Sequence, residues 1–238
     1  ADINDLMEKQ TPESIERFVN MLVSMGHESP LEHSSFSFAI EGVSRSLTHQ
    51  LVRHRIASYS QQSQRYVNLE NSFKYVIPRK IREYAHTKQI FENAMESAFE
   101  NYVKISRELL EQFMYEYVVE ELKVYDADAS IDTIEEYMKT THKKKYNAFV
   151  KVAIENARAV LPNACETKII CTMNLRTLIN FCHHRCCRRA QDEIFDLAWA
   201  MRKEVEKVSP LLAKSLGANC QFGACPEGSM CCGNPFPK

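Results

Sequence analysis

The segment HQLVRHRIASYSQQSQRY, residues 49–66, carries three consecutive cationic or titratable side chains, Arg53, His54 and Arg55. No Asp or Glu lies between Glu41 and Glu70, so these arginines have no partner nearby in the sequence. Guanidinium groups bind phosphate through paired hydrogen bonds, and the neighbouring Ser and Gln side chains suit the edges of a planar heterocycle. The segment therefore indicates a nucleotide or anion site, with a solvated basic patch as the alternative.

The same segment divides into a helix end and an extended piece. Apolar residues repeat at helical spacing from Ser44 to about His54, whereas residues 56–77 are typical of extended chain. On the helix, Gln50 and Arg53 are three residues apart and share a face. On the extended piece, Ser63 and Arg65 are two apart and point to the same side. We expect a polar pocket where these four side chains meet.

Composition limits the classes of protein to which the chain can belong. Charged residues make up 26% and apolar residues 45%, as in an ordinary globular protein, and the net charge of −1 gives no overall attraction to nucleic acid or membrane. The acidic first residues lack a signal-type apolar region, and no apolar run approaches the roughly 20 residues of a membrane helix. We therefore expect a cytoplasmic protein whose nine cysteines are mostly reduced thiols.

The rest of the chain predicts an α+β fold with a central, mostly antiparallel sheet flanked by long helices. We expect a single domain over residues 1–216, with a helical insertion over about 79–161, and a cysteine-rich arm over 217–238. The expected strands are 36–40 and 167–173. The expected helices begin at Thr11-Pro12, span about 79–125 and 131–161 with a break at 126–130, run from the N-cap Asn174 to about Phe181, and cover 191–208.

A second polar cluster, Cys182 to Arg189, combines thiols, imidazoles and arginines. Cys182 and Cys186 are one helical turn apart, and with the tail cysteines they suggest a zinc or iron–sulfur site. No Cys-x2-Cys pair occurs, which favours thiols packed between helices and predicts no metal. The glycine-rich nucleotide-binding motifs are absent as well, so any phosphate is expected to be bound by side chains.

Several motifs, in one order along the chain, resemble those of the flavin-dependent thymidylate synthases. Arg53-His54-Arg55 followed by seven residues and Ser63 resembles the family's RHR-x7-S motif, and residues 28–33, ESPLEH, resemble its E-[ST]-P-x-E-H loop. The further matches are Gln50-x-x-Arg53, Ala157-Arg158-x-x-Leu161-Pro162, Asn174-x-Arg176-x3-Asn180 followed by Arg185, and the tail Cys225-Pro226-Glu227-Gly228.

This resemblance implies a homotetramer that binds FAD and dUMP at subunit interfaces. It also implies the conversion of dUMP, methylenetetrahydrofolate and NADPH to dTMP, tetrahydrofolate and NADP. The positions that match the family's FAD contacts are Ser29, Arg53, His54, Arg55, Gln61, Asn174, Leu175, Arg176 and Asn180. Those that match its dUMP contacts are Gln50, Leu51, Val52, Arg53, Gln61, Gln62, Ser63, Gln64, Arg65, Arg158 and Arg185.

One position departs from the family pattern. Many members have Asn-Glu where this chain has Ser60-Gln61, and that Glu contacts both flavin and nucleotide. Gln61 keeps the hydrogen-bonding reach of the Glu but is neutral, so we expect it to bind the ligands without relaying a proton.

The resemblance also suggests how the uracil ring is activated. Carbon 5 of uracil needs electron density pushed into the ring, which a Cys adding at carbon 6 would supply, but none of the nine thiols is placed for this by the family pattern. We therefore expect Arg185 to stabilise the ionised pyrimidine. The alternative from another class is a metal-stabilised nucleic-acid-binding protein that uses the arginine clusters on phosphates.

Overall fold

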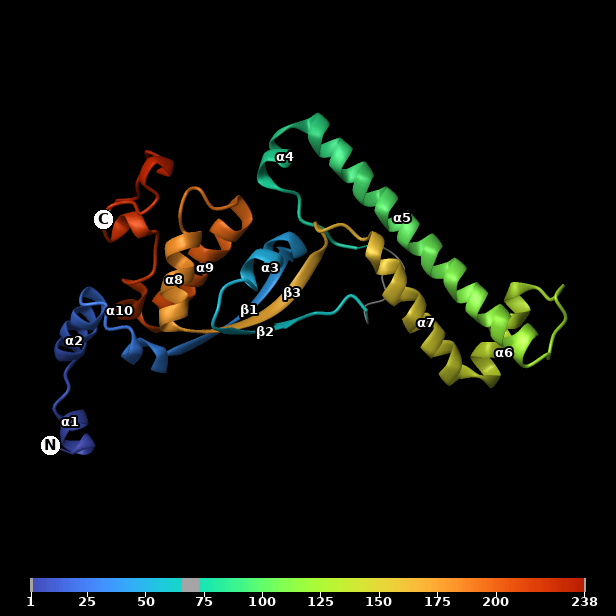
Figure 1. Ribbon diagram of the computed structural model, residues 1–238, viewed down its shortest axis with the longest axis horizontal. Helices are drawn as coiled ribbons and strands as arrows, with labels where there is room; N and C mark the ends of the chain where they lie inside the picture. The colour runs from blue at the N-terminus through green and yellow to red at the C-terminus, as the bar shows by residue number, and fades with distance from the viewer. Residues whose placement is uncertain (1, 66–72, 238) are drawn as a thin grey trace. The chain divides into compact units, whose positions relative to one another are not determined.

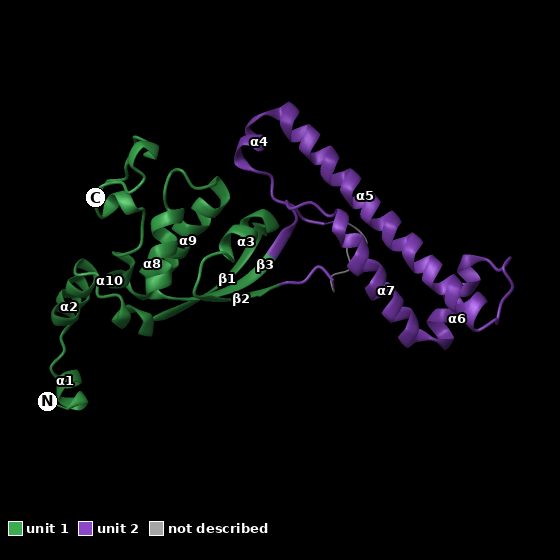
Figure 2. Cartoon of the chain, viewed as in Figure 1, with its two compact units in different colours: residues 1–61, 168–238 green, residues 62–167 purple. Residues whose placement is uncertain are grey.

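The computed structural model describes residues 2–65 and 73–237, and the chain divides into two compact units (Figures 1 and 2). Unit 1 contains residues 1–61 and 168–238, and unit 2 contains residues 62–167. The expected helical insertion over 79–161 lies inside unit 2, and the expected arm over 217–238 belongs to unit 1. No helix in the described part of the chain is long and apolar enough to cross a membrane.

Unit 1 is built on a three-stranded sheet of β1 (Ser35–Ser44), β2 (Ala57–Gln61) and β3 (Glu166–Asn174), in the order β1-β3-β2. β2 and β3 are antiparallel, with a register that runs from Ala57 opposite Met173 to Gln61 opposite Ile169. Ile169, Cys171 and Met173 are buried, whereas Ile170 between them is 54% exposed. One face of the sheet therefore carries the core. The predicted α+β class and both predicted strands are confirmed.

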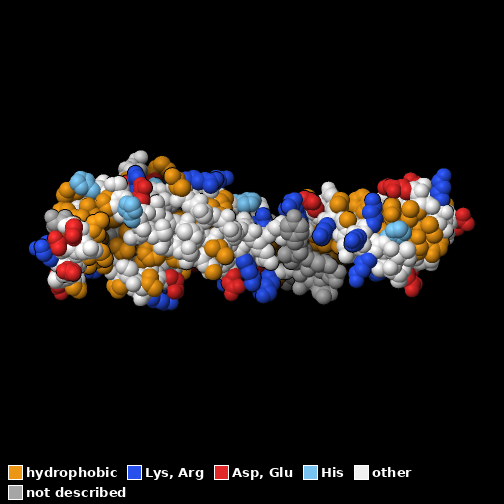
Figure 3. Space-filling view, turned by 90° about the horizontal axis from the view of Figure 1, so that it is seen from below, with side chains coloured by type: hydrophobic (Ala, Val, Ile, Leu, Met, Phe, Trp, Pro, Cys, Tyr) orange, Lys and Arg blue, Asp and Glu red, His pale blue; other side chains and the backbone are white. Residues whose placement is uncertain are grey.

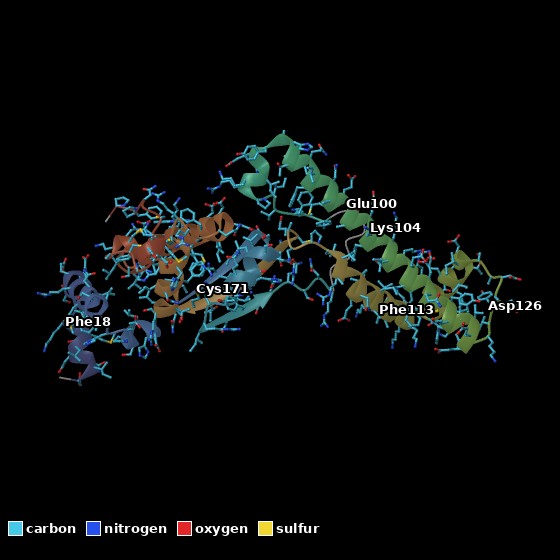
Figure 4. The ribbon with its side chains drawn as sticks, turned by 45° about the horizontal axis from the view of Figure 1, so that its top comes forward. Phe18, Glu100, Lys104, Phe113, Asp126 and Cys171 are labelled. Carbon is cyan, nitrogen blue, oxygen red and sulfur yellow. The ribbon has the colours of Figure 1, made fainter. Side chains whose placement is uncertain are left out.

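Helices cover the buried face of this sheet. The core is formed mainly by α3 (Arg45–Leu51), α8 (Leu175–Arg185) and α9 (Asp192–Val208), which bury Leu47, Leu51, Leu178, Phe181, Ile194 and Met201. Figure 4 shows Cys171 on the sheet within this unit. The remaining helices of the unit are α1 (Ile3–Glu8), α2 (Pro12–Ser24) and α10 (Pro210–Ala213), with 3-10 turns at Ser29–His33, Asn219–Gln221 and Gly228–Met230.

Helix α8 is one turn longer than predicted. Asn174 caps it as expected, since its side-chain oxygen accepts the Thr177 N–H at 2.9 Å, but the helix continues past Phe181 to Arg185. Phe181 and Cys182 are fully buried, so packing stabilises the extra turn, and the sequence there offers no Gly or Pro to end it. The consequence is that Arg185 occupies the last turn of a helix that is anchored in the core.

Unit 2 is helical. It contains α4 (Arg79–Glu83), α5 (Ala85–Tyr115), a π-helical turn at Glu116–Glu121, α6 (Ile131–Thr141), α7 (Lys143–Ala157) and a 3-10 turn at Arg158–Val160. The prediction of one continuous helix over 131–161 is wrong, because the backbone of His142 leaves the helical region and separates α6 from α7. Its imidazole nitrogens lie 3.4 and 3.3 Å from the hydroxyls of Tyr117 and Tyr137, contacts that account for the break.

The helices of unit 2 share a separate apolar core of Met114, Val118, Ile134 and Met138. Phe113, labelled on α5 in Figure 4, packs against Phe149 of α7 with ring centroids 5.7 Å apart. The predicted extended segment 56–77 contains β2 and an isolated bridge between Tyr75 and Cys165. Its middle, residues 66–72, lies outside the described residues.

Candidate functional site

The turn that carries Arg53, His54 and Arg55 is fixed at both sides by buried or partly buried hydrogen bonds. Before it, the Ser44 hydroxyl caps α3, and the Ser44 N–H and hydroxyl both donate at 2.6 Å to the carboxylate of Glu193 on α9. After it, the hydroxyl of Tyr59 on β2 lies 2.9 Å from the carbonyl oxygens of both Leu51 and His54. Burial raises the pKa of Tyr59, which keeps its hydroxyl protonated as a donor.

The structure brings together His54 and Arg185, which are 131 residues apart in the sequence. The Nε of Arg185 donates to Nε2 of His54 at 3.0 Å, and Phe181 meets the imidazole edge to face at 4.9 Å. Burial, followed by the charges of Arg185 and His184, lowers the pKa of His54 to about 4. His54 is therefore neutral near pH 7, and its Nε2 is the acceptor nitrogen. A neutral imidazole orients the charged guanidinium of Arg185 without repelling it.

Arg185 itself lies in a strongly positive environment. Its pKa is lowered by burial and by the nearby charge of Arg53, although an arginine stays protonated at any working pH. Two neighbouring guanidinium groups, one half-buried and one exposed, make this corner of unit 1 attractive to an anion. In the described part of the chain, neither Arg53 nor Arg55 has a carboxylate partner.

We predict that His54 makes the stability of the protein depend on pH. Its folded-state pKa of about 4 lies below the ordinary 6.5, so the unfolded chain binds the proton first, and stability falls as the pH drops from about 6.5 towards 4. The loss amounts to at most about 3 kcal/mol, because each pKa unit is worth about 1.4 kcal/mol. Urea unfolding at several pH values should show the His54→Gln variant losing less stability than the parent over this range.

An exposed histidine on the same helix provides the control for this pH experiment. His49 lies on the exposed face of α3, so His49→Gln should keep the loss of stability that His54 causes at low pH. Identical pH profiles for the parent and His54→Gln would contradict the assignment of a neutral, buried imidazole.

The side chains predicted beside His54 lie on α3 and β2. Gln61 donates through Nε2 to the Thr48 hydroxyl at 3.0 Å, and Thr48 in turn donates to the Arg45 carbonyl. Gln50 is half-buried at the end of α3. Leu51 is fully buried and its carbonyl is engaged by Tyr59, while the partly buried Val52 packs on the core. Leu51 therefore contributes to the shape of the site from the core side.

The predicted cofactor contacts at the start of α8 are held by ion pairs and hydrogen bonds with residues 28–34. Arg176 is exposed and pairs with Glu28 at 2.7 Å and with Glu32 at 2.6 Å, both in the loop that also carries the exposed Ser29. The Leu175 side chain is buried, and its N–H donates to the Ser34 carbonyl at 2.8 Å. Asn180 is exposed one turn further along α8.

The remaining predicted residues lie in unit 2, where Glu155 joins two of the arginines. Arg65 pairs through Nη1 with the Glu155 carboxylate at 2.9 Å, and the Nε of Arg158 donates to the Glu155 carbonyl at 3.3 Å. The Ser63 hydroxyl accepts the Arg65 N–H at 3.2 Å. The sequence segment around Arg65 lacked a carboxylate, but the fold supplies one from α7. The other two predicted residues, Gln62 and Gln64, line a small cavity of about 60 Å³ with Phe73, Lys74 and Cys165 to Thr167.

Sequence reasoning missed three residues that organise these clusters: Tyr59, Glu155 and Glu193. Tyr59 lies inside the segment 49–66, where side chains alternate between the two sides of a half-buried strand. This alternation is the signal that points to Tyr59. Glu155 precedes Arg158 by three residues on a helix, which places both on one face. Glu193 has no local signal, because its partner Ser44 is 149 residues away.

The buried cysteines are poor candidates for a nucleophile. Burial raises the pKa of Cys171 to about 11, and a thiol hydrogen bond with Cys186, followed by burial, raises the pKa of Cys182. Both are therefore neutral thiols at pH 7, and the thiolate is the nucleophilic form. No group of three or more potential metal ligands among the described His, Cys, Asp and Glu side chains converges on one ion position.

The chain is similar to known proteins over most of its length. The family described as Thymidylate synthase complementing protein matches residues 1–211. A flavin-dependent thymidylate synthase of Clostridium tetani is 52% identical over 231 residues, covering 97% of this chain and 82% of that protein. Proteins of the same name from Geobacter sulfurreducens and Pyrococcus furiosus are 42% identical over 234 residues and 38% over 230, covering 97% and 92% of this chain and 82% and 76% of those proteins.

Proposed function

The chain belongs to the family of flavin-dependent thymidylate synthases, and on this premise we propose that Arg185 activates the uracil ring of dUMP. The reaction converts dUMP, methylenetetrahydrofolate and NADPH to dTMP, tetrahydrofolate and NADP, with FAD as the cofactor. The 3.0 Å bond from Arg185 to a neutral His54 is the observation that carries the proposal.

The exposed polar surface of unit 1 fits a flavin dinucleotide. Arg53 and Arg55 present guanidinium groups that have no carboxylate partner among the described residues, and such groups bind a pyrophosphate through paired hydrogen bonds. Ser29, Arg176 and Asn180 add exposed hydroxyl, guanidinium and amide groups at the start of α8. When bound, FAD supplies the hydride for the methyl group. The protein residues bind and orient the cofactor and the nucleotide.

Arg185 acts on the pyrimidine through charge. Loss of the N3 proton to solvent would leave negative charge spread over the ring oxygens and carbon 5, and a fixed guanidinium stabilises that charge more than it stabilises the neutral ring. His54 accepts the Nε–H of Arg185, and this hydrogen bond fixes the orientation of the guanidinium group. The positive field of Arg53 adds to the stabilisation of the anion. The ring then becomes nucleophilic at carbon 5 without a covalent bond to the enzyme.

The dUMP phosphate is assigned to the second arginine cluster. Glu155 orients Arg65 and Arg158 from one turn of α7, and Ser63 lies beside Arg65. Arg158 donates through Nε to a carbonyl, and its terminal nitrogens have no hydrogen-bond partner among the described residues. Two arginines and a hydroxyl are a suitable donor set for a phosphate dianion.

We predict that Arg158→Ala acts on nucleotide binding more than on chemistry. Loss of a charged hydrogen bond to phosphate costs about 1.5–3 kcal/mol, so the KM for dUMP should rise by about 10- to 100-fold while kcat changes little. Lys151, exposed on the same helix α7, gives the matched control: Lys151→Ala removes a cation and should leave KM unchanged. An unchanged KM in steady-state assays of Arg158→Ala would remove this residue from the phosphate site.

Gln61 is assigned to binding. Its amide nitrogen is engaged with Thr48, an interaction that fixes the direction of the side chain, and a neutral amide has no proton to relay. We also propose a homotetramer, which is supported by the exposed apolar side chains Ile15, Phe18 and Met21 on α2. Figure 3 shows hydrophobic side chains, in orange, on the surface of unit 1. Light scattering on the purified protein measures the oligomeric state directly. The predicted cytoplasmic location stays a prediction.

Absorbance of the purified protein tests the proposed function most simply. The protein should be yellow from bound FAD, should bleach with NADPH under anaerobic conditions, and should form dTMP when dUMP and methylenetetrahydrofolate are added. A colourless protein that binds DNA in a salt-dependent manner would contradict it. The family match does not support that alternative.

A further inference from the structure

A cavity at the end of α8 adjoins Arg185, the residue assigned to the uracil ring. The cavity, of about 280 Å³, lies in unit 1 between residues 183–190 and residues 218–236. Three arginines line it, Arg185, Arg188 and Arg189, and five of the nine cysteines line it as well. Small-molecule pockets usually measure about 300–1,000 Å³, so this one has room for part of a substrate rather than for the whole of it.

Positive charge predominates in the wall of this cavity. Glu227 is the one Asp or Glu among the described residues that line it, against the three arginines, which leaves two positive charges in excess. Glu227 pairs with Arg189 at 3.3 Å, so a carboxylate already binds to this wall. An excess of positive charge around a partly enclosed space attracts an anionic ligand.

Arg188 is the cation of the wall that is best placed to bind such a ligand. Its Nε donates to the Asn234 carbonyl at 3.0 Å, and its guanidinium stacks over the Phe236 ring at 4.0 Å. Within residues 2–65 and 73–237, its two terminal nitrogens have no hydrogen-bond partner and no carboxylate pairs with it. A guanidinium that is held in this way offers its remaining N–H donors to a carboxylate in a fixed geometry.

The C-terminal segment forms the other wall, and it is attached to the rest of unit 1. Phe236 packs on Trp199 of α9 with ring centroids 5.2 Å apart, and Arg189 donates to the Met230 carbonyl. Pro235 and Phe236 give this wall an apolar part that suits an aromatic ring. The cavity therefore combines cations with apolar surface, and the arginines that supply its charge also hold its shape.

We propose that this cavity is the subsite for the p-aminobenzoyl-glutamate tail of methylenetetrahydrofolate, with Arg188 and Arg189 binding the carboxylates. The inference rests on the proposed function. The methylene group of this cosubstrate has to reach carbon 5 of the uracil ring, where Arg185 acts, and Arg185 lines the cavity. The tail carries an aromatic ring and carboxylates, which match the apolar groups and the arginines of the wall. NADPH is also anionic, but its hydride goes to the flavin and need not reach carbon 5.

Folates with one and with three glutamates test this inference, because the longer tail carries two more carboxylates. Calorimetric titration of the complete flavoprotein with tetrahydrofolate monoglutamate and triglutamate, without oxygen, measures binding independently of turnover. The triglutamate should bind at least about fivefold more tightly, as expected when partly exposed ion pairs are added. The KM for methylenetetrahydrofolate should show the same preference between its monoglutamate and triglutamate forms.

Variants of Arg188 show whether its charge causes the preference. Arg188→Gln should reduce the preference to about twofold or less, whereas Arg188→Lys, which keeps a cation, should retain most of it. A purely structural role of Arg188 would affect both variants alike. Lys203→Gln is the control, because it removes an exposed cation of α9 that does not line the cavity, and it should keep the full preference. Retention of FAD by each variant shows that it has folded.

A measurement on the parent keeps the test decisive even where a variant fails to fold. Raising NaCl from about 0.05 M to about 0.5 M should reduce the preference for the triglutamate, because salt screens exposed ion pairs. Equal affinity of the parent for both forms, or the full preference in Arg188→Gln, would overturn the inference. A higher KM for NADPH in Arg188→Gln with an unchanged folate preference would also overturn it, and would assign the cavity to NADPH. Formation of dTMP with the monoglutamate tests the proposed function separately.

Discussion

Replacing Arg185 with alanine should lower kcat by about a hundredfold to a thousandfold. This is the usual cost of removing one group that stabilises developing negative charge. The uracil ring is neutral when it binds and anionic when it reacts, so the guanidinium contributes mainly to the transition state. The KM for dUMP should change much less than kcat, because the phosphate is assigned to Arg65 and Arg158. Stopped-flow and steady-state assays of dTMP formation measure both constants.

Controls separate this effect from general damage to the protein. The Arg185→Ala variant should keep its FAD absorbance, and Arg17→Ala, an exposed arginine on α2, should have the turnover of the parent. Arg185→Lys keeps a cation but loses the Nε donor to His54, so its kcat should lie between those of the parent and the alanine variant. Turnover within about threefold of the parent in Arg185→Ala, well below the loss expected for such a group, would refute the assignment.

Replacing Phe181 with alanine should produce the largest loss of stability. Phe181 is fully buried in the core of unit 1, and phenylalanine-to-alanine changes in cores cost about 3–5 kcal/mol. For a chain of this size the melting temperature should fall by roughly 10 °C. The same ring packs edge to face on His54 at 4.9 Å, so the support for Arg185 loosens and kcat should fall in the protein that remains folded.

An exposed apolar residue in the same unit is the control for this experiment. Val208 is 74% exposed at the end of α9, and Val208→Ala should change the free energy of unfolding by no more than about 0.5 kcal/mol. Calorimetry on both variants gives the comparison. Equal melting temperatures for Phe181→Ala and the parent would mean that the packing of Phe181 on α8 does not stabilise unit 1.

Much of the local structure could be predicted because its causes are local. Thr11-Pro12 and Asn174 begin helices through side-chain caps and a preset φ, and the alternation in residues 36–40 and 167–173 follows from a sheet with one buried face. The longer end of α8 and the break at His142 were not predictable in this way. Each depends on packing against residues distant in sequence or on ring contacts made only in the folded unit.

The sequence by itself specifies the chemical groups of this protein. These are an arginine- and amide-rich segment at 49–66, the family motifs, and nine cysteines whose spacing gives them no role. Only the fold supplies the partners, since Arg185 meets His54 across 131 residues, Ser44 meets Glu193 across 149, and Arg65 meets Glu155 across 90. The physical reason is that charge, hydrogen-bonding capacity and local backbone preference belong to a residue and its neighbours. Burial, a lowered imidazole pKa and a cavity lined by sulfur arise only when distant segments pack together.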